Sequence, residues 1–120
     1  MVEVLVTDEF VGWFETLDDA DGRAVKRCVD LLEQRGVALG HPHASAINGS
    51  RYALRELRIQ SGGRPLRVLY AFDPRRNAVL ILGGDKTGDG RFYERMVPRA
   101  ENIWAQYLAE QAAGLHDEED

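Results

Sequence analysis

The chain has 120 residues, of which 44% are hydrophobic and 29% are charged, a composition typical of one small globular domain and not of a disordered chain. No apolar run approaches the roughly 18 residues of a transmembrane helix, the N-terminus has no secretory signal pattern, and a single cysteine, Cys28, cannot form an internal disulfide. We therefore expect one domain over residues 1–115, an acidic disordered tail over 116–120, and a cytoplasmic location.

Charge is distributed unevenly along the chain. Residues 1–50 carry 4 basic and 9 acidic side chains, residues 51–99 carry 11 and 5, and residues 100–120 carry none and 6. Ten of the eleven central basic residues are arginine, which can bind phosphate through two parallel hydrogen bonds. The net charge of −5 argues against nucleic acid as a partner, whereas the central segment indicates one basic face on an acidic protein. A strand whose solvent face carries arginine explains the charge alone equally well.

The first third of the chain predicts a strand followed by two helices. Residues 2–6 are short and rich in valine, which is typical of a strand. Thr7 or Asp8 can then cap a helix whose aromatic residues repeat at helical spacing. A longer helix follows the turn at residues 18–19 and ends at Gly36, and we expect the two helices to form an antiparallel pair.

The middle of the chain predicts a meander of three strands. After a loop over residues 36–51, the pattern places strands at 52–59, 66–72 and 78–83. The third strand is apolar on both faces, as a central or covered strand would be. In the second strand alternate residues share a face, which puts Leu66, Val68, Tyr70 and Phe72 on one side and Arg67, Leu69 and Ala71 on the other.

The last third predicts a glycine-rich loop and helices. The loop covers residues 83–90, a short helical piece follows, and Pro98 is suited to the first turn of a separate terminal helix. The whole order predicts a small α+β domain, with a twisted antiparallel sheet, an N-terminal helix pair packed on it and a C-terminal helix.

Most of the recognisable chemical motifs are absent. His41 and His43 could bind zinc, but no third ligand is evident, and we expect neither a metal nor another cofactor. Cys28 lies on the apolar stripe of the second helix, so we expect a core residue. The glycine-rich loop lacks the spacing of a phosphate-binding P-loop.

Arg67 interrupts a strongly apolar strand, so its charge needs a partner or a route to solvent. One interpretation is an ion pair with Glu56 on the neighbouring strand. The other is an anion site, in which Arg55, Arg58 and Arg67 on adjacent strands converge with Lys86 on a phosphate. Tyr93 could serve such a site as an acid, a base or a stacking surface, or could be a half-buried aromatic of the terminal helix.

Three blocks of sequence carry a resemblance to a known family. They are GSRYALRELR at 49–58, GRPLRVLYAFDPRRNAVLILGGDKTGD at 63–89 and FYERMVPRAENIWAQYL at 92–108. The chain resembles the RelE/ParE superfamily of toxins, and within it the HigB-type, phage Gp49-like toxins of type II toxin–antitoxin pairs. The resemblance is weakest before residue 48. It implies a small twisted sheet with two helices on one side, a HigA-like antitoxin with a helix-turn-helix fold as partner, and no membrane partner.

The resemblance also implies an activity. RelE-type toxins cut messenger RNA on the ribosome without a metal, through attack of the 2′-hydroxyl on the adjacent phosphate to leave a 2′,3′-cyclic phosphate. Arg67 stands where the family grips the scissile phosphate, and Lys86, Tyr93 and Arg55 complete the catalytic set that the resemblance implies. We expect three further arginines to bind RNA: Arg51, Arg58 and Arg91.

Two departures leave the acid and base unassigned. Glu56 stands where the RelE branch has a lysine, and Thr87 where it has an arginine. Arginine is a poor base, so Tyr93 or Glu56 is the candidate for proton transfer. A different class of function stays open: a ParE-like inhibitor of DNA gyrase that cleaves nothing, or a decayed toxin that only binds its antitoxin. We expect the antitoxin to use an acidic or helical segment that covers the basic face or holds the terminal helix.

Overall fold

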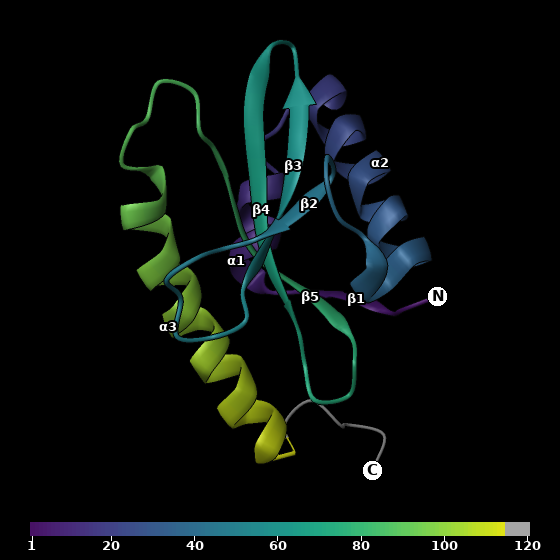
Figure 1. Cartoon of the computed structure of the whole chain (residues 1–120), viewed down its shortest axis with the longest axis vertical. Helices are drawn as coiled ribbons and strands as arrows, with labels where there is room; N and C mark the ends of the chain where they lie inside the picture. The colour runs from purple at the N-terminus through teal and green to yellow at the C-terminus, as the bar shows by residue number, and fades with distance from the viewer. Residues whose placement is uncertain (115–120) are drawn as a thin grey trace.

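The computed structural model describes residues 1–114, so the acidic tail expected at 116–120 lies outside the described residues. Five strands form one sheet in the order β1-β5-β4-β3-β2. The sheet and its helices confirm the predicted α+β class (Figure 1). In chain order the elements are β1 (Val4–Val6), α1 (Asp8–Phe14), α2 (Asp19–Arg35), the short 3-10 helix η1 (Gly36–Ala38), β2 (Ala44–Ala46), β3 (Arg55–Ser61), β4 (Arg64–Phe72), β5 (Ala78–Asp85) and α3 (Phe92–Ala112).

The sheet is mixed, which corrects the expectation of an antiparallel sheet. Strand β1 runs parallel to β5, with Val4 beside Ala78 and Val6 beside Leu80. All the other neighbouring strands are antiparallel. A strand pattern predicts that residues 4–6 are extended but carries no information about the neighbour that they choose. Strand β2 was expected to be loop, because three small residues give too short a pattern to recognise.

Helices cover both faces of the sheet (Figure 1). Helices α1 and α2 pack on one face, α1 against β5 and α2 against β3, and α3 packs on the other face. The predicted alternation of β4 is confirmed, since Leu66, Val68 and Tyr70 join the core under α1 and α2, and Leu69 and Ala71 join the core under α3. Strand β5 is buried on both sides, as its apolar sequence predicted.

The predicted helix boundaries near the N-terminus are confirmed. The hydroxyl oxygen of Thr7 accepts a hydrogen bond from the Phe10 backbone at 3.0 Å and caps α1. The same hydroxyl donates to the carbonyl of Ile81 at 2.6 Å, so the cap also fixes α1 to β5. Helix α2 ends at Gly36, whose φ of 55° is in the left-handed region that glycine adopts without strain.

Two adjacent glycines let helices approach β5 from both faces. A Cβ on Gly83 would lie 2.2 Å from the Trp13 ring of α1, and a Cβ on Gly84 would lie 2.9 Å from the Phe92 ring of α3. Both glycines belong to β5, whereas the sequence pattern ended the strand at Gly83 and placed Gly84 in the loop. Gly84 is the cross-strand partner of Arg67, so the start of α3 is held directly against that part of the sheet.

Helix α3 is continuous through Pro98, which corrects the expected division into a short helical piece and a terminal helix. Proline lacks the N–H that would donate to the carbonyl of Glu94, so one helical hydrogen bond is lost. The buried residues on both sides of the proline form one stripe against the sheet, and this packing keeps the helix whole. That stripe consists of Phe92, Met96, Ala100 and Trp104.

Candidate functional site

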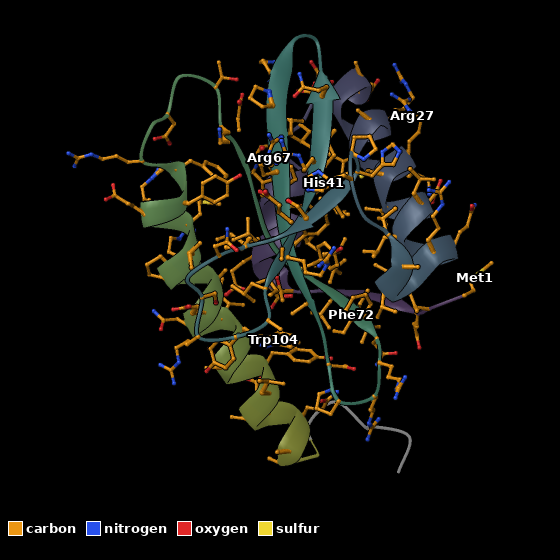
Figure 2. The ribbon with its side chains drawn as sticks, viewed as in Figure 1. Met1, Arg27, His41, Arg67, Phe72 and Trp104 are labelled. Atoms are coloured by element: carbon orange, nitrogen blue, oxygen red, sulfur yellow. The ribbon has the colours of Figure 1, made fainter. Side chains whose placement is uncertain are left out.

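Arg67 is buried in the middle of β4, on the face that α3 covers. Its exposed fraction is 6%, and Figure 2 shows it in the upper part of the sheet, on a different level from Trp104 further along α3. One guanidinium nitrogen, Nη1, donates to the carbonyl of Leu66 at 3.1 Å. A buried charge is costly unless it is paired, so the surrounding groups decide how this arginine is tolerated.

Glu56 on β3 is the acidic partner of Arg67. Its carboxylate oxygen Oε1 lies 3.6 Å from Nε of Arg67, and the glutamate is itself only 5% exposed. The ion-pair interpretation is therefore confirmed. The pair is loose, because Nε of Arg67 is buried and makes no hydrogen bond to any residue that the structure describes. A guanidinium N–H that is buried without an acceptor can accommodate a further acceptor.

The Glu56 carboxylate connects four elements of the fold. Oε1 accepts a hydrogen bond of 2.6 Å from the Tyr93 hydroxyl of α3. Oε2 accepts from the Ser45 hydroxyl of β2 at 3.1 Å and from Nη1 of Arg58 at 3.2 Å. Two residues of β3, Glu56 and Arg58, are two positions apart, and Arg58 pairs directly with Arg67 of β4. All three side chains therefore lie on the same face of the sheet. We call Ser45, Glu56, Arg58, Arg67 and Tyr93 the Glu56 cluster.

Tyr93 is held in its protonated form by this environment. Burial raises the pKa of its hydroxyl, the hydrogen bond to Glu56 raises it further, and the nearby Arg67 guanidinium opposes the shift. A tyrosine with a raised pKa keeps its proton at neutral pH, so it donates a hydrogen bond to Glu56 and can act as a proton donor but not as a base. Within this cluster the carboxylate of Glu56 is the group that can accept a proton.

Lys86 places a cation at the outer edge of the Glu56 cluster. Its Nζ lies 5.8 Å from the centre of the Tyr93 ring, within the range of a cation–π contact. Its backbone N–H donates to the carbonyl of Pro65 at 2.9 Å, which fixes the start of the glycine-rich loop to β4. The side chain of Arg58 is 37% exposed, so the cluster reaches solvent through this arginine as well as at Lys86.

Arg55, which was expected in the catalytic set, does not lie with the Glu56 cluster. It directly precedes Glu56 along β3, and side chains alternate along a strand, so it lies on the opposite face. There its Nε donates to the Tyr70 hydroxyl at 3.2 Å, and its Nη2 donates to the carbonyl of Leu39 at 3.2 Å. The alternation already present in the sequence separates Arg55 from Arg58.

The other two expected RNA-binding arginines lie further out. Arg51 stacks on Tyr52, with 5.2 Å from Cζ to the ring centre, and its backbone N–H donates to Glu101 of α3. Glu101 follows Tyr93 by eight residues, about 12 Å along a helix. Arg91 is exposed at the start of α3 and pairs with Glu94 at 3.8 Å. Sequence reasoning missed Ser45, because the segment around it was expected to be irregular.

The candidate metal ligands are not gathered into a site. Among residues 1–114 no group of three or more histidine, cysteine, aspartate or glutamate side chains is placed to hold a metal ion. Cys28 is buried in the core under α2, as predicted, and burial raises the pKa of its thiol to about 11. No helix in the same range is long and apolar enough to span a bilayer.

The fold and the Glu56 cluster define a small α+β protein with a paired carboxylate, two guanidinium groups and a tyrosine hydroxyl on one sheet face. The chain matches the phage-derived Gp49-like family over residues 12–105. It is 36% identical over 113 residues to a protein of Mycobacterium tuberculosis (strain ATCC 25618 / H37Rv) named “Putative toxin HigB3”. The aligned region covers 92% of this chain and 97% of that protein. The chain therefore belongs to the Gp49-like family, which confirms the HigB-type resemblance of its sequence.

A second relative comes from the same strain. The protein named “Putative toxin HigB2” is 36% identical over 101 residues, which cover 82% of this chain. The matched region spans 50% of that protein, so this chain spans about half the length of the second relative.

Proposed function

We propose that the protein is the toxin of a toxin–antitoxin pair and that it cleaves messenger RNA on the ribosome. Family membership and the names of the two relatives support the first part. The observation that carries the second part is the buried Arg67, whose Nε lies beside Glu56 but has no hydrogen-bond acceptor within residues 1–114. A phosphate oxygen is an acceptor of the right charge for that N–H.

The proposed reaction uses the groups of the Glu56 cluster in separate roles. Glu56 accepts the proton of the RNA 2′-hydroxyl as its oxygen attacks the adjacent phosphorus. Arg67 and Lys86 stabilise the additional negative charge on the phosphate oxygens. The bond to the 5′-oxygen breaks, and that oxygen takes a proton from Tyr93. The products are a 2′,3′-cyclic phosphate and a 5′-hydroxyl, and proton transfer from Glu56 to Tyr93 restores both groups.

RNA must rearrange the cluster before this reaction can begin. The Glu56 carboxylate currently accepts hydrogen bonds from Tyr93, Ser45 and Arg58. A bound phosphate competes with it for Arg58 and Arg67, and this competition frees the carboxylate to meet the 2′-hydroxyl. The requirement is consistent with a toxin that is inactive on free RNA and active where the ribosome orders the substrate.

The decisive test compares Arg67→Ala with Arg55→Ala, two arginines on neighbouring strands and opposite faces of one sheet. Each variant is added to a bacterial translation extract, and messenger RNA ends are mapped by primer extension. We expect Arg67→Ala to lower cleavage by about 10²–10³-fold and Arg55→Ala to retain it, provided that melting curves show both variants folded. Equal cleavage by Arg67→Ala and the parent would refute the site.

The same purified protein can also be tested for the alternative function, inhibition of DNA gyrase. A ParE-like protein would leave messenger RNA intact and inhibit DNA supercoiling by purified gyrase. Intact messenger RNA, together with inhibited supercoiling, would therefore replace the ribonuclease proposal with that alternative.

A further inference from the structure

The turn between β3 and β4 is attached to the first turn of α2 through a buried carboxylate. Ser61 and Arg64 are the cross-strand pair that closes the turn. Both donate to Asp21 of α2, the Ser61 hydroxyl to Oδ1 at 2.5 Å and Nη2 of Arg64 to Oδ2. Asp21 is only 5% exposed, so these charge-assisted hydrogen bonds hold the β3–β4 turn and the start of α2 together (Figure 1).

The same arginine also reaches the end of β5. Nη1 of Arg64 donates to Oδ2 of Asp85 at 3.3 Å, so one planar guanidinium joins Asp21 on α2 to Asp85 on β5. The side chains of Arg64 and Asp85 are 38% and 40% exposed. An ion pair this close to solvent contributes little to the free energy of unfolding. The pair does, however, fix the direction of the Asp85 carboxylate.

The Asp85 carboxylate fixes the residues that follow it. Its Oδ1 accepts the backbone N–H and the hydroxyl of Thr87, at 2.9 and 2.5 Å. Between these two residues, Lys86 donates its backbone N–H to the carbonyl of Pro65 at 2.9 Å, and its own carbonyl accepts from Asp89 at 3.1 Å. Hydrogen bonds, chiefly from Thr87, hold the pKa of Asp85 below its usual value, so the carboxylate is charged at neutral pH. The backbone is therefore held on both sides of Lys86.

The place of this backbone decides where the Lys86 charge can lie. A lysine carries one compact ammonium on a flexible stem, and its effect on a phosphate falls with distance. Nζ of Lys86 lies over the Tyr93 ring at the outer edge of the Glu56 cluster. Arg64 is three positions from Arg67 along β4, so its side chain leaves the sheet on the opposite face, towards α2. Arg64 can therefore affect the cluster through the turn that carries Lys86.

We propose that Arg64 is a positioning residue, which acts through Asp85 to hold the turn from which Lys86 reaches Tyr93. The contribution of this position to cleavage rests on the proposed function, whereas the position itself does not. Asp21 holds the other side of the guanidinium, so the start of α2 belongs to the same support. A charge on one face of the sheet thus determines where a second charge lies on the other face.

The position of Lys86 can be measured without RNA, because the chain has only two lysines. The other, Lys26 of α2, has a side chain that is 74% exposed and serves as the internal reference. The full chain is prepared with isotope-labelled lysine, and the Cε proton signals are recorded by NMR. We expect the Lys86 signal upfield of the Lys26 signal, because an aromatic ring current shifts protons above the ring face upfield and the Lys86 ammonium lies over Tyr93.

Two variants remove different parts of this support. Arg64→Gln removes the guanidinium that joins α2 to β5. Asp85→Asn is milder, because it keeps an oxygen that can accept from Thr87 and loses the charge that faces Arg64. We expect both variants to move the Lys86 signal towards that of Lys26, and the milder variant keeps the test valid if Arg64→Gln does not fold.

The matched control breaks another arginine–aspartate pair of the same loop. Arg95 of α3 pairs with Asp89, beyond the turn that carries Lys86. Arg95→Gln should leave the Lys86 signal where it is in the parent. An unmoved Lys86 signal in Asp85→Asn, with a melting curve that shows the variant folded, would overturn the inference.

Cleavage kinetics then separate a positioning role from direct RNA binding by Arg64. On purified ribosomes loaded with messenger RNA, we expect Arg64→Gln and Asp85→Asn each to lower kcat by about tenfold, within the roughly 10²-fold that a misplacement of about 1 Å can cost. KM should change by less than about twofold. In a Lys86→Met background, Arg64→Gln should cause no further loss of kcat, because its effect passes through Lys86. A raised KM with unchanged kcat, or a further tenfold loss in that background, would overturn the inference.

Failure of this inference and failure of the proposed function are distinguishable, because the NMR measurement does not depend on RNA. A parent chain that leaves messenger RNA intact would refute the proposed function, and the lysine signals would still show whether Arg64 positions Lys86. Cleavage by the parent, together with a Lys86 signal that neither variant moves, would refute the positioning role alone.

Discussion

Two buried carboxylates lie under α3, and their surroundings differ in kind. Glu56 accepts from Tyr93 near the start of the helix, and Asp73, which is 4% exposed, accepts from Tyr107 at 2.9 Å near its end. The two tyrosines are fourteen residues apart, roughly 21 Å along the helix. Each carboxylate thus joins the sheet to the same helix through a tyrosine hydroxyl.

Asp73 has a structural environment. Its Oδ1 accepts the backbone N–H groups of Arg75 and Asn77 at 2.9 Å each, which closes the turn between β4 and β5. Its Oδ2 accepts from Tyr107 and Gln111, which fixes the end of α3 to that turn. Burial by itself would raise the pKa of Asp73, but the hydrogen bonds from Asn77, Gln111 and Tyr107 outweigh it and hold the pKa below its usual value.

The Glu56 cluster contains a buried charge pair whose hydrogen bonds are incomplete within residues 1–114. Glu56 stands between Arg67 and Arg58, and Nε of Arg67 makes no hydrogen bond to any of residues 1–114. A buried ion pair is weak evidence for stabilisation, because apolar residues of the same volume often serve equally well. A carboxylate that accepts hydrogen bonds from the turn and the helix that it joins holds structure, whereas one that faces Arg67 at 3.6 Å without a hydrogen bond can exchange that partner.

The largest expected effect is a difference in messenger RNA cleavage between variants of Glu56 and Asp73. Glu56→Gln removes the proposed proton acceptor and should lower messenger RNA cleavage by about 10²–10⁴-fold in the translation extract. Asp73→Asn, far along α3, should cleave at nearly the rate of the parent at a temperature where both variants are folded. Equal losses in the two variants would mean that Glu56 acts only through folding.

The second effect concerns stability, and we expect a larger loss from the change at Asp73 than from a change in the Glu56 cluster. Asp73→Ala leaves the turn N–H groups and the donors of α3 without their acceptor, so we expect the free energy of unfolding to fall by about 2–4 kcal/mol. Urea denaturation followed by circular dichroism measures it. Ser45→Ala, which removes one of several hydrogen bonds to Glu56, is the control and should cost less than half as much.

The third effect is the response to acid. The lowered pKa of Asp73 stabilises the folded chain at pH values above its unfolded pKa of about 3.9, and this stabilisation is lost as the pH falls through the lower folded value. Asp21 and Asp85 also have lowered pKa values, so the parent loses stability in this range for several reasons. Asp73→Asn should therefore show a shallower fall in unfolding free energy between pH 5 and 2 in denaturant titrations. Parallel curves for parent and variant would contradict the structural role of the charge.

The smallest expected effect is the loss of unfolding free energy when either tyrosine hydroxyl is removed. Tyr107→Phe and Tyr93→Phe each remove one hydroxyl that donates to a buried carboxylate, and each should lower the unfolding free energy by about 1 kcal/mol. Only Tyr93→Phe should also slow cleavage, since the proposed leaving oxygen takes its proton there. A cleavage defect of the same size in Tyr107→Phe would remove the distinction between the two ends of α3.

Much of the candidate site could be expected from local pattern. The alternation of side chains along β4 predicts that Arg67 faces the other side of the sheet from Val68 and Tyr70. The ion pair of Arg67 with Glu56 could be expected because the two residues lie on neighbouring strands. The same alternation along β3 separates Arg55 from its neighbour Glu56, so the two side chains lie on opposite faces. Ser45 could not be found this way, because a three-residue edge strand has no pattern of its own and forms only against β3.

The sequence by itself determined the elements whose apolar spacing is regular, namely α1, α2, β4 and β5, because period and burial are properties of neighbouring residues. It also determined that Cys28 is a core residue and that Arg67 needs a partner. Only the tertiary structure decided the parallel place of β1, the continuity of α3 through Pro98 and the meeting of Glu56, Ser45 and Tyr93. These features depend on contacts between residues far apart in the chain, and their free energy appears only when the sheet and α3 pack together.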